Sequence, residues 1–161
     1  YVFLTSTRIG EIFNQNNINI PLLRHHIKKE NVFFKLDFNT KEDCLDFMIK
    51  KLEKDDIVKE GFRKSVYKRE NIGSAVLENG VAIPHGLPTE VNEIGLVILT
   101  LKRPIRWSTS WVDMIVLIAV PEDKIIEFES MVLELYEMIS NTDVLEEIKK
   151  IKSIDECTFE K

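Results

Sequence analysis

Two nearly continuous apolar runs, residues 94–101 and 114–120, constrain the fold of this chain more than any other feature. Both runs are rich in β-branched residues, which favour strands, and Pro121 ends the second one. A strand with one exposed face alternates apolar and polar residues, whereas a continuous apolar run is typical of a strand covered on both faces. The chain is therefore expected to place other elements on both sides of a sheet.

Four segments have the spacing of amphipathic helices and can supply these covering layers. Thr40 is expected to cap the first, with Asp43 at the third position, and the second covers residues 59–69. The third covers residues 122–139, and the last runs from a cap at Asn141 or Thr142 to Lys150. The inward faces of the first three are Cys44, Leu45, Met48, Ile49 and Leu52; then Phe62, Val66 and Tyr67; then Ile125, Phe128, Val132, Leu135, Met138 and Ile139.

Shorter strands complete the pattern. Residues 32–36 are predicted to form one strand, and residues 75–77 and 81–83 form a hairpin around the turn Glu78-Asn79-Gly80. Strands that alternate with helices indicate an α/β domain, here with a mixed central sheet flanked by helices on both faces. Residues 1–30 are Asn-rich and are predicted to be a linker or N-terminal arm with a short helix over 22–29, so the domain covers residues 31–161.

Composition excludes several classes of protein. The 161 residues fit one domain, with 44% hydrophobic and 30% charged residues, as in a soluble globular protein. No apolar run approaches the ~20 residues that span a membrane. The net charge of −5 argues against nucleic-acid binding. Cys44 and Cys157 belong to no CxxC pair and are predicted to be reduced thiols.

Neither a metal site nor a cofactor is expected, because the chain has three histidines and two of them, His25 and His26, are neighbours. The polar stretch that begins at Thr5 follows the apolar residues 2–4 at once, which predicts no signal peptide. A cytoplasmic protein is therefore expected. The first residue is Tyr1 instead of Met, which indicates a fragment of a longer chain.

One local motif has the features of a chemical site. A hydrophobic strand leads to His85, Pro84 fixes the backbone before it, and Gly86 removes a side chain after it. Ligands tend to bind at strand ends of open α/β sheets. The motif therefore predicts an imidazole at a strand end with open space beside it.

A neutral imidazole is nucleophilic near pH 7 and suits the transfer of a phosphoryl group. Arg69 is the candidate cation for the phosphoryl oxygens, and Ser74 and backbone N–H groups around Gly86 are candidate donors. The alternative is that His85 is an inert surface histidine in a proline-containing turn. The motif alone does not separate these two interpretations.

The segment Ala82-Ile83-Pro84-His85-Gly86, with Arg69-Glu70 upstream, resembles the signature of enzyme IIA domains of the fructose/mannitol class. These domains belong to the bacterial phosphoenolpyruvate-dependent sugar phosphotransferase system. The similarity extends over residues 27–150 and includes Thr40-Lys41-Glu42 at the helix opening.

The resemblance implies a mixed sheet flanked by helices, with His85 accepting a phosphoryl group from the phosphocarrier protein HPr. It also implies that Arg69 takes the position of the conserved arginine in the family motif. Glu70, Ser74, Pro84 and Gly86 are the supporting residues that this assignment names.

Two departures from the family pattern concern the same site. The family often carries a second histidine in the helix after the closing proline, where this chain has Glu127-Phe128-Glu129, and a threonine where it has Ser74-Ala75. A second imidazole would steady the phosphoryl group and set the tautomer of His85. Its loss is expected to affect onward transfer more than phosphorylation. His25 or His26 is an alternative source of that imidazole, but a solvated basic turn is the favoured interpretation of this pair.

A basic and aromatic cluster lies between the two strong strands. It consists of Lys102, Arg103, Arg106, Trp107 and Trp111. It can be a nucleic-acid or partner surface, or an exposed loop that its tryptophans fold over the core. The family has a similar connection, Pro-Ile-x-Trp, which favours the second interpretation.

Three functions fit these features. The favoured one is the regulatory domain of a sugar-operon transcriptional regulator, in which phosphorylation of His85 by phosphorylated HPr reports sugar supply. The second is a IIA component that relays the phosphoryl group to a IIB domain during sugar uptake. The third is a partner-binding domain without chemistry. In none of these does the domain itself contact nucleic acid or a membrane.

Overall fold

A five-stranded sheet forms the centre of the protein in the computed structural model, which describes residues 3–5, 14–153 and 158–160. Its strands are β2 (Val32–Leu36), β3 (Val76–Leu77), β4 (Val81–Ala82), β5 (Gly95–Trp107) and β6 (Ser110–Ala119). The spatial order is β2-β5-β6-β4-β3. β2 runs parallel to β5 and β4 parallel to β6, whereas the β5–β6 and β3–β4 pairs are antiparallel. The expected mixed sheet is confirmed.

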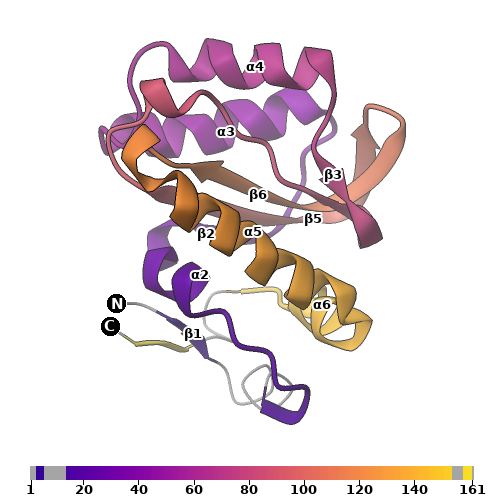
Figure 1. Cartoon of the computed structure of the whole chain (residues 1–161). Helices are drawn as coiled ribbons and strands as arrows, with labels where there is room; N and C mark the ends of the chain where they lie inside the picture. Colours follow the sequence, from indigo (N-terminus) through magenta and orange to yellow (C-terminus); the bar gives the residue numbers. More distant parts are fainter. Residues whose placement is uncertain (1–2, 6–13, 154–157, 161) are drawn as a thin grey trace.

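Five α-helices of the described residues cover both faces of this sheet (Figure 1). One face carries α3 (Lys41–Lys54) and α4 (Phe62–Ile72), and the other carries α2 (Pro21–His26), α5 (Ile125–Ser140) and α6 (Thr142–Lys150). No helix in the described part of the chain combines the length and apolar character needed to cross a membrane.

Short elements connect or accompany these layers. The 3-10 turns are η1 (Lys29–Asn31), η2 (Glu78–Gly80), η3 (Pro88–Glu90) and η4 (Glu122–Lys124). A separate two-stranded sheet pairs β1 (Phe3–Thr5) with β7 (Thr158–Glu160) in antiparallel orientation. Residues 6–13 of the predicted arm and Cys157 lie outside the described residues.

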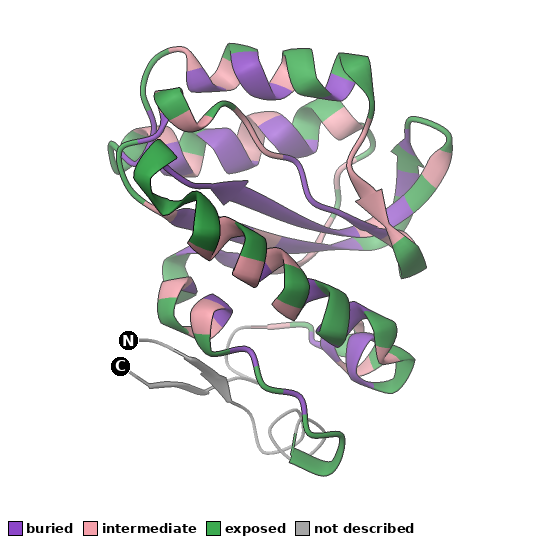
Figure 2. Ribbon diagram, in the orientation of Figure 1, coloured by how far each residue is buried: buried purple, intermediate pink, exposed green. Residues whose placement is uncertain are grey.

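The alternation of side chains along β6 explains why two cores form. Met114, Val116 and Ile118 pack in the cluster beneath α2, α5 and α6. Ile115, Leu117 and Ala119 pack in the cluster beneath α3 and α4. Buried residues therefore predominate in the central part of β5 and β6, whereas the hairpin end of the two strands is partly exposed, as Figure 2 shows. Each buried aliphatic side chain contributes roughly 1.5–3 kcal/mol, so these strands stabilise both layers.

Two helix starts agree with the predicted caps. The Thr40 hydroxyl accepts a hydrogen bond from the Asp43 N–H at 3.1 Å, which satisfies an otherwise unpaired donor at the start of α3. The Asn141 side chain accepts from the Val144 N–H at 3.1 Å at the start of α6. The sequence left the choice of cap open between Asn141 and Thr142, and the structure shows that Asn141 is the cap.

Helix α4 begins at Phe62, three residues later than predicted. The preceding residues pair with another segment instead. The Lys59 N–H donates to the Glu90 carbonyl at 2.7 Å, and the Asn92 N–H donates to the Ile57 carbonyl at 2.8 Å. This pairing holds residues 57–59 extended, so the helix cannot start there.

The interpretation of residues 102–111 as an exposed loop is wrong. β5 and β6 continue through this region as a hairpin, and its turn is residues 108–109, with Ser108 at a φ of 60°. Trp107 is fully buried, whereas Trp111 is 60% exposed and the Arg106 guanidinium lies 5.1 Å from its ring centre. Cross-strand pairing overrides the polar composition of this segment.

The second half of the predicted arm packs on the domain. Ile18, Ile20, Leu23 and Ile27 are buried in the same core as α5. The Glu134 carboxylate of α5 accepts hydrogen bonds from the Leu22 and Leu23 N–H groups, at 3.1 and 2.9 Å. A carboxylate at the first turn of α2 satisfies its unpaired donors. The division at residue 30 stays a prediction.

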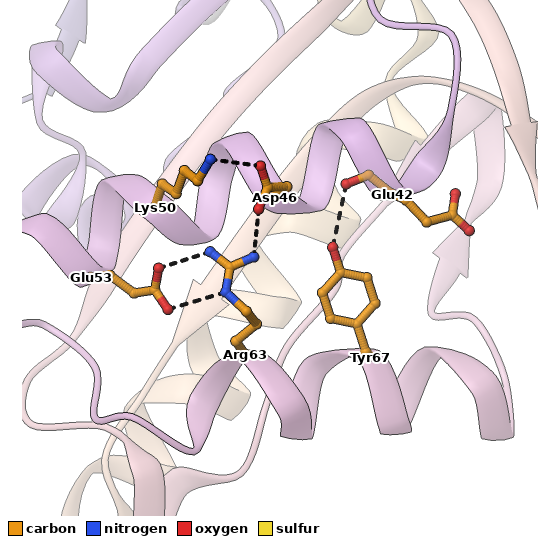
Figure 3. Close-up of polar contacts among 6 residues, drawn as sticks. All are labelled: Glu42, Asp46, Lys50, Glu53, Arg63 and Tyr67. Atoms are coloured by element: carbon orange, nitrogen blue, oxygen red, sulfur yellow. Dashed lines mark hydrogen bonds and ion pairs between the residues drawn. The ribbon is translucent and has the colours of Figure 1, made fainter.

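A polar network joins the two helices of the α3–α4 layer (Figure 3). The Arg63 guanidinium donates to Asp46 Oδ1 at 2.7 Å and to both oxygens of Glu53, at 2.8 and 3.2 Å. Lys50 adds an ion pair with Asp46 at 3.0 Å. A forked guanidinium held by two carboxylates has a defined geometry, so Arg63 fixes the position of α4 on α3.

We expect Arg63→Ala to lower the free energy of unfolding by about 1 kcal/mol near pH 7, because the α3–α4 network loses its central cation. Hydrogen bonds from Lys50 and Arg63 lower the pKa of Asp46 from its usual value of 3.8. A carboxyl group whose pKa is lower in the folded state stabilises that state at pH values above its unfolded pKa. This contribution is lost as the pH falls through the folded pKa. The difference between wild type and variant should therefore narrow as the pH falls below 3.8.

Urea unfolding followed by circular dichroism at several pH values measures this difference. Arg63→Lys is the matched control, because it keeps the charge and loses the fork, and its stability should lie between the other two. Equal stability of wild type and Arg63→Ala near neutral pH would contradict the role of the network.

Candidate functional site

His85 lies three residues after the end of β4, beside β6. The Ile118 N–H donates to the Pro84 carbonyl at 3.1 Å, and His85 forms an isolated parallel bridge with Ile118. The chain therefore follows β6 for three residues beyond Ala82 before it turns away. This pairing places the imidazole at a strand end, as the sequence motif predicts.

One hydrogen bond determines which imidazole nitrogen is free. His85 Nδ1 lies 3.2 Å from the Ile83 carbonyl oxygen. A carbonyl oxygen only accepts, so Nδ1 carries the proton and the neutral ring has its lone pair on Nε2. The Phe128 ring, with its centre 5.8 Å from that of His85, packs beside the imidazole. In this arrangement Nε2 is the ring nitrogen without a proton.

The pocket at His85 is apolar apart from the imidazole itself. It is lined by His85, Gly86, Pro88, Ile118, Val120, Ile125 and Phe128. Ile125 and Phe128 come from the first turn of α5, in the region where the resemblance leads one to expect a second histidine. In this chain the imidazole therefore faces hydrocarbon there.

Helix α4 approaches the other side of the His85 loop. A Cβ atom at Gly86 would lie 2.5 Å from Ser65 Oγ and 2.8 Å from the Phe62 ring, so the close approach requires glycine. The Leu87 N–H donates to Ser65 Oγ at 3.0 Å, and Ser65 in turn donates to the Phe62 carbonyl at 2.7 Å. The loop is thus attached to the first turns of α4.

Arg69 is exposed, and its guanidinium donates to the Gly73 carbonyl at 2.5 Å. The segment that follows Gly73 pairs with the strand of His85, because the Ile83 N–H donates to the Ala75 carbonyl at 2.8 Å. Arg69 is therefore tied to the chain that neighbours the His85 strand. Among the described residues, no hydrogen bond or ion pair joins Arg69 to His85.

Glu70, which is buried, and Ser74, which is half-buried, form a separate cluster. Glu70 Oε1 accepts hydrogen bonds from Ser74 Oγ at 2.9 Å and Trp107 Nε1 at 3.0 Å, and Lys41 Nζ lies 3.7 Å away. Neither residue lines the His85 pocket. Their contacts connect the end of α4 to α3 and to the β5–β6 hairpin, which is a structural role.

Glu127 and Glu129 of α5 do not line the His85 pocket. Glu127 forms ion pairs with Lys124 at 3.5 Å and, when the imidazole is protonated, with His26 at 4.0 Å, and Glu129 is exposed. Burial, together with the neighbouring His25, lowers the pKa of His26. His26 does not line the His85 pocket. In the described ranges, no three His, Cys, Asp or Glu side chains gather as a metal-binding group.

Sequence reasoning missed Ser65 and assigned Ile125 and Phe128 only to the core-facing stripe. The sequence did carry a signal that Ser65 is buried. Ser65 lies three positions after Phe62 and directly before Val66, both of which were assigned to the inward face of the helix. Such a residue, when buried, needs a hydrogen-bond partner. The partner, Leu87, is 22 residues away and becomes visible only in the fold.

The match to a family model decides the classification. The model "Phosphoenolpyruvate-dependent sugar phosphotransferase system, EIIA 2" matches residues 25–158. The chain belongs to this family. The resemblance inferred from the Pro-His-Gly motif is thereby confirmed.

Relatives of two kinds share this domain. The chain is 28% identical over 133 residues to the "Probable licABCH operon regulator" of Bacillus subtilis (strain 168), which covers 83% of this chain and 21% of the regulator. It is 24% identical over 128 residues to the mannitol-specific phosphotransferase enzyme IIA component of Staphylococcus aureus (strain N315), with 78% and 89% coverage. The chain thus spans about a fifth of the length of that regulator.

Solved structures of IIA domains share the fold. The crystal structure of the mannitol IIA of Escherichia coli superposes with a TM-score of 0.70 at 22% identity, over 81% of this chain and 94% of that one. A complex of the Escherichia coli mannitol enzymes IIA and phosphorylated IIB gives a TM-score of 0.71 at 21% identity, over 81% and 92%. At this identity the similarity establishes the fold.

Proposed function

We propose that this IIA domain accepts a phosphoryl group from phosphorylated HPr on Nε2 of His85. The observation that carries the proposal is the hydrogen bond from Nδ1 to the Ile83 carbonyl, which leaves the Nε2 lone pair free. Membership of the phosphotransferase family supports the same chemistry. The domain would act in the cytoplasm, where phosphorylated HPr is available.

In the proposed step, the Nε2 lone pair attacks the phosphorus atom of the donor. The bond from Nε2 to phosphorus forms while the bond from phosphorus to the carrier atom of the donor breaks, and that atom keeps the bonding electron pair. The Nδ1 proton stays on the imidazole and continues to donate to Ile83. The ring that carries the phosphoryl group thus keeps one fixed orientation.

The surface beside the pocket suits a protein donor. Ile125, which lines the pocket, is 38% exposed, and its chain neighbour Ile126 is 80% exposed. Leu87, two residues after His85, is 57% exposed. Glu122, Asp123 and Glu129 are exposed near them in sequence. A donor with an apolar contact patch and basic residues at its edge would complement this surface.

Arg69 is proposed as the cation that stabilises the transferring group. Its side chain is exposed and has one hydrogen bond, to Gly73, on the segment beside the His85 strand. Exchange of that bond for a phosphoryl oxygen would bring a planar guanidinium to the developing charge. Pro84 and Gly86 would hold the loop geometry, and the hydrogen-bonded pair Glu70 and Ser74 would support α4.

We further propose that the domain is the regulatory part of a sugar-operon transcriptional regulator. The apolar wall of Ile118, Val120, Ile125 and Phe128 offers no second imidazole to assist departure of the phosphoryl group. Slow departure suits a sensor, whose phosphorylated state must persist. Similarity to the Bacillus subtilis regulator over most of this chain supports this assignment.

The alternative is a IIA component that relays the phosphoryl group to a IIB domain. Its support is the match to the mannitol IIA component of Staphylococcus aureus over 89% of that protein's length. A domain that only binds partners is the third possibility. The acceptor and retention measurements below separate the three.

We expect purified domain to be labelled on incubation with phosphoenolpyruvate, enzyme I and HPr, and His85→Ala to remain unlabelled. The label should be acid-labile and base-stable, as a phosphoramidate is. Circular dichroism should show the same fold for both proteins, because His85 contributes little to the core. Equal labelling of His85→Ala would refute His85 as the acceptor, and an unlabelled wild type would leave the partner-binding function.

Arg69→Ala should slow labelling by roughly 10²-fold if its guanidinium stabilises the transferring group, which is the effect of losing one such contact. Arg69→Lys keeps the charge without the fork and should recover part of the rate. Quench-flow labelling at saturating HPr measures both variants against wild type. A wild-type rate in Arg69→Ala would remove Arg69 from the chemical step.

Ile125→His should accelerate loss of label to a IIB acceptor. Ile125 lines the pocket and is partly exposed, so an imidazole at this position can donate a hydrogen bond to a phosphoryl oxygen. Ile125→Gln, which adds a polar side chain without an imidazole, is the control. The measurement is the half-life of labelled domain with a panel of IIB proteins. Rapid transfer from the wild type itself would favour the relay function over the sensor.

A further inference from the structure

Ser65 is a buried polar residue that neither the sequence motif nor the family resemblance singles out. It is 8% exposed and lies on α4, twenty residues before His85. Its hydroxyl donates to the Phe62 carbonyl at 2.7 Å and accepts from the Leu87 N–H at 3.0 Å. The first bond is local to its own helix, whereas the second reaches the loop that carries His85.

Hydrogen bonds hold the chain directly before His85 and directly after Gly86. On the β6 side, the Ile118 N–H donates to the Pro84 carbonyl at 3.1 Å. On the α4 side, Ser65 accepts from Leu87. His85 and Gly86 lie between these two points, so the backbone that carries the imidazole is held from both directions.

Close packing accompanies the second attachment. A Cβ atom at Gly86 would lie 2.5 Å from Ser65 Oγ, so the loop backbone rests directly on this side chain. The first attachment uses only backbone atoms and belongs to the sheet. The second depends on a single hydroxyl group, which a substitution can remove.

We propose that Ser65 is a positioning residue for phosphorylation of His85. It acts through the Leu87 N–H, which holds the loop so that Nδ1 faces the Ile83 carbonyl and Nε2 faces the pocket. Ser65 does not line that pocket and is buried, so it does not touch the phosphoryl donor. This inference rests on the proposed function of His85.

Four variants test the proposal by rate measurements. Ser65→Ala removes the acceptor of the hydrogen bond. Leu87→Pro removes its donor, and Leu87 already has φ −70° and ψ 130°, which proline adopts. Leu87→Ala keeps the N–H and controls for loss of the exposed leucine side chain. The double variant Ser65→Ala with Leu87→Pro completes the cycle.

Ser65→Ala should label about tenfold more slowly than wild type at saturating HPr, with the KM for HPr unchanged, because misplacement of the nucleophile affects the chemical step. Leu87→Pro should be slower than Leu87→Ala by a similar factor. If one hydrogen bond carries both effects, the double variant is no slower than Leu87→Pro. Multiplication of the two effects, or a wild-type rate in Ser65→Ala, would overturn the proposal.

Loss of stability is controlled with Val66→Ala, a substitution of the buried apolar residue that follows Ser65 on the same helix, because the Leu87 N–H donates to Ser65 and not to Val66. It should lower the free energy of unfolding and leave the labelling rate of the folded protein unchanged. A rate reduced as much as in Ser65→Ala would show that general destabilisation explains the effect, and would overturn the positioning role.

A second readout needs no phosphorylation. Nitrogen-15 NMR of the His85 imidazole should show the Nδ1–H tautomer in wild type and a mixture of tautomers in Ser65→Ala. If wild type is never labelled, the proposed function fails while this measurement still tests the role of Ser65. If wild type is labelled and both proteins show the same tautomer and rate, the inference about Ser65 fails alone.

Discussion

Burial of the β5–β6 pair on both faces is the constraint on which the rest of the structure depends. Successive residues of β6 enter different cores, so each face must be covered by helices. Helices α3 and α4 cover one face, and α2, α5 and α6 cover the other. A strand of this kind cannot be exposed without the loss of several buried aliphatic side chains, each worth roughly 1.5–3 kcal/mol.

The site follows from that arrangement. β4 pairs with β6, and the chain beyond it continues along β6 as far as His85. α4, on one layer, contributes Ser65 and Phe62 beside Gly86, while α5, on the other layer, contributes Ile125 and Phe128. The imidazole thus lies where the sheet and both helical layers meet. The sheet, α4 and α5 thus surround the loop that carries His85.

The chemistry of the pocket gives a physical reason to separate acceptance of a phosphoryl group from its release. Under the proposed function, the Nδ1–H hydrogen bond to Ile83 would prepare Nε2 for attack without a second imidazole. Release to another protein profits from polar groups around the phosphoryl oxygens, and the pocket wall here is hydrocarbon. Under the proposed function, a hydrocarbon wall favours a sensor, whereas a wall with polar groups would favour a relay.

The sequence predicted the elements of the fold because their signals are local. Apolar periodicity located the strong strands and helices, and Thr40 and Asn141 marked two helix starts. The prediction of a loop at residues 102–111 was wrong, because cross-strand pairing makes this polar segment a hairpin. The predicted start of α4 was three residues too early. Both errors concern residues whose conformation depends on distant partners.

The sequence by itself determined that a histidine would stand at a strand end, since Pro84, His85 and Gly86 follow an apolar strand. Only the tertiary structure decided which imidazole nitrogen is free, that Glu70 and Ser74 form a cluster apart from the pocket, and that Ser65 holds the loop. The physical reason is that hydrogen bonds and packing act over a few ångströms. Folding brings Ser65 and Leu87 within hydrogen-bonding distance, but nothing in the linear sequence indicates that these two residues pair.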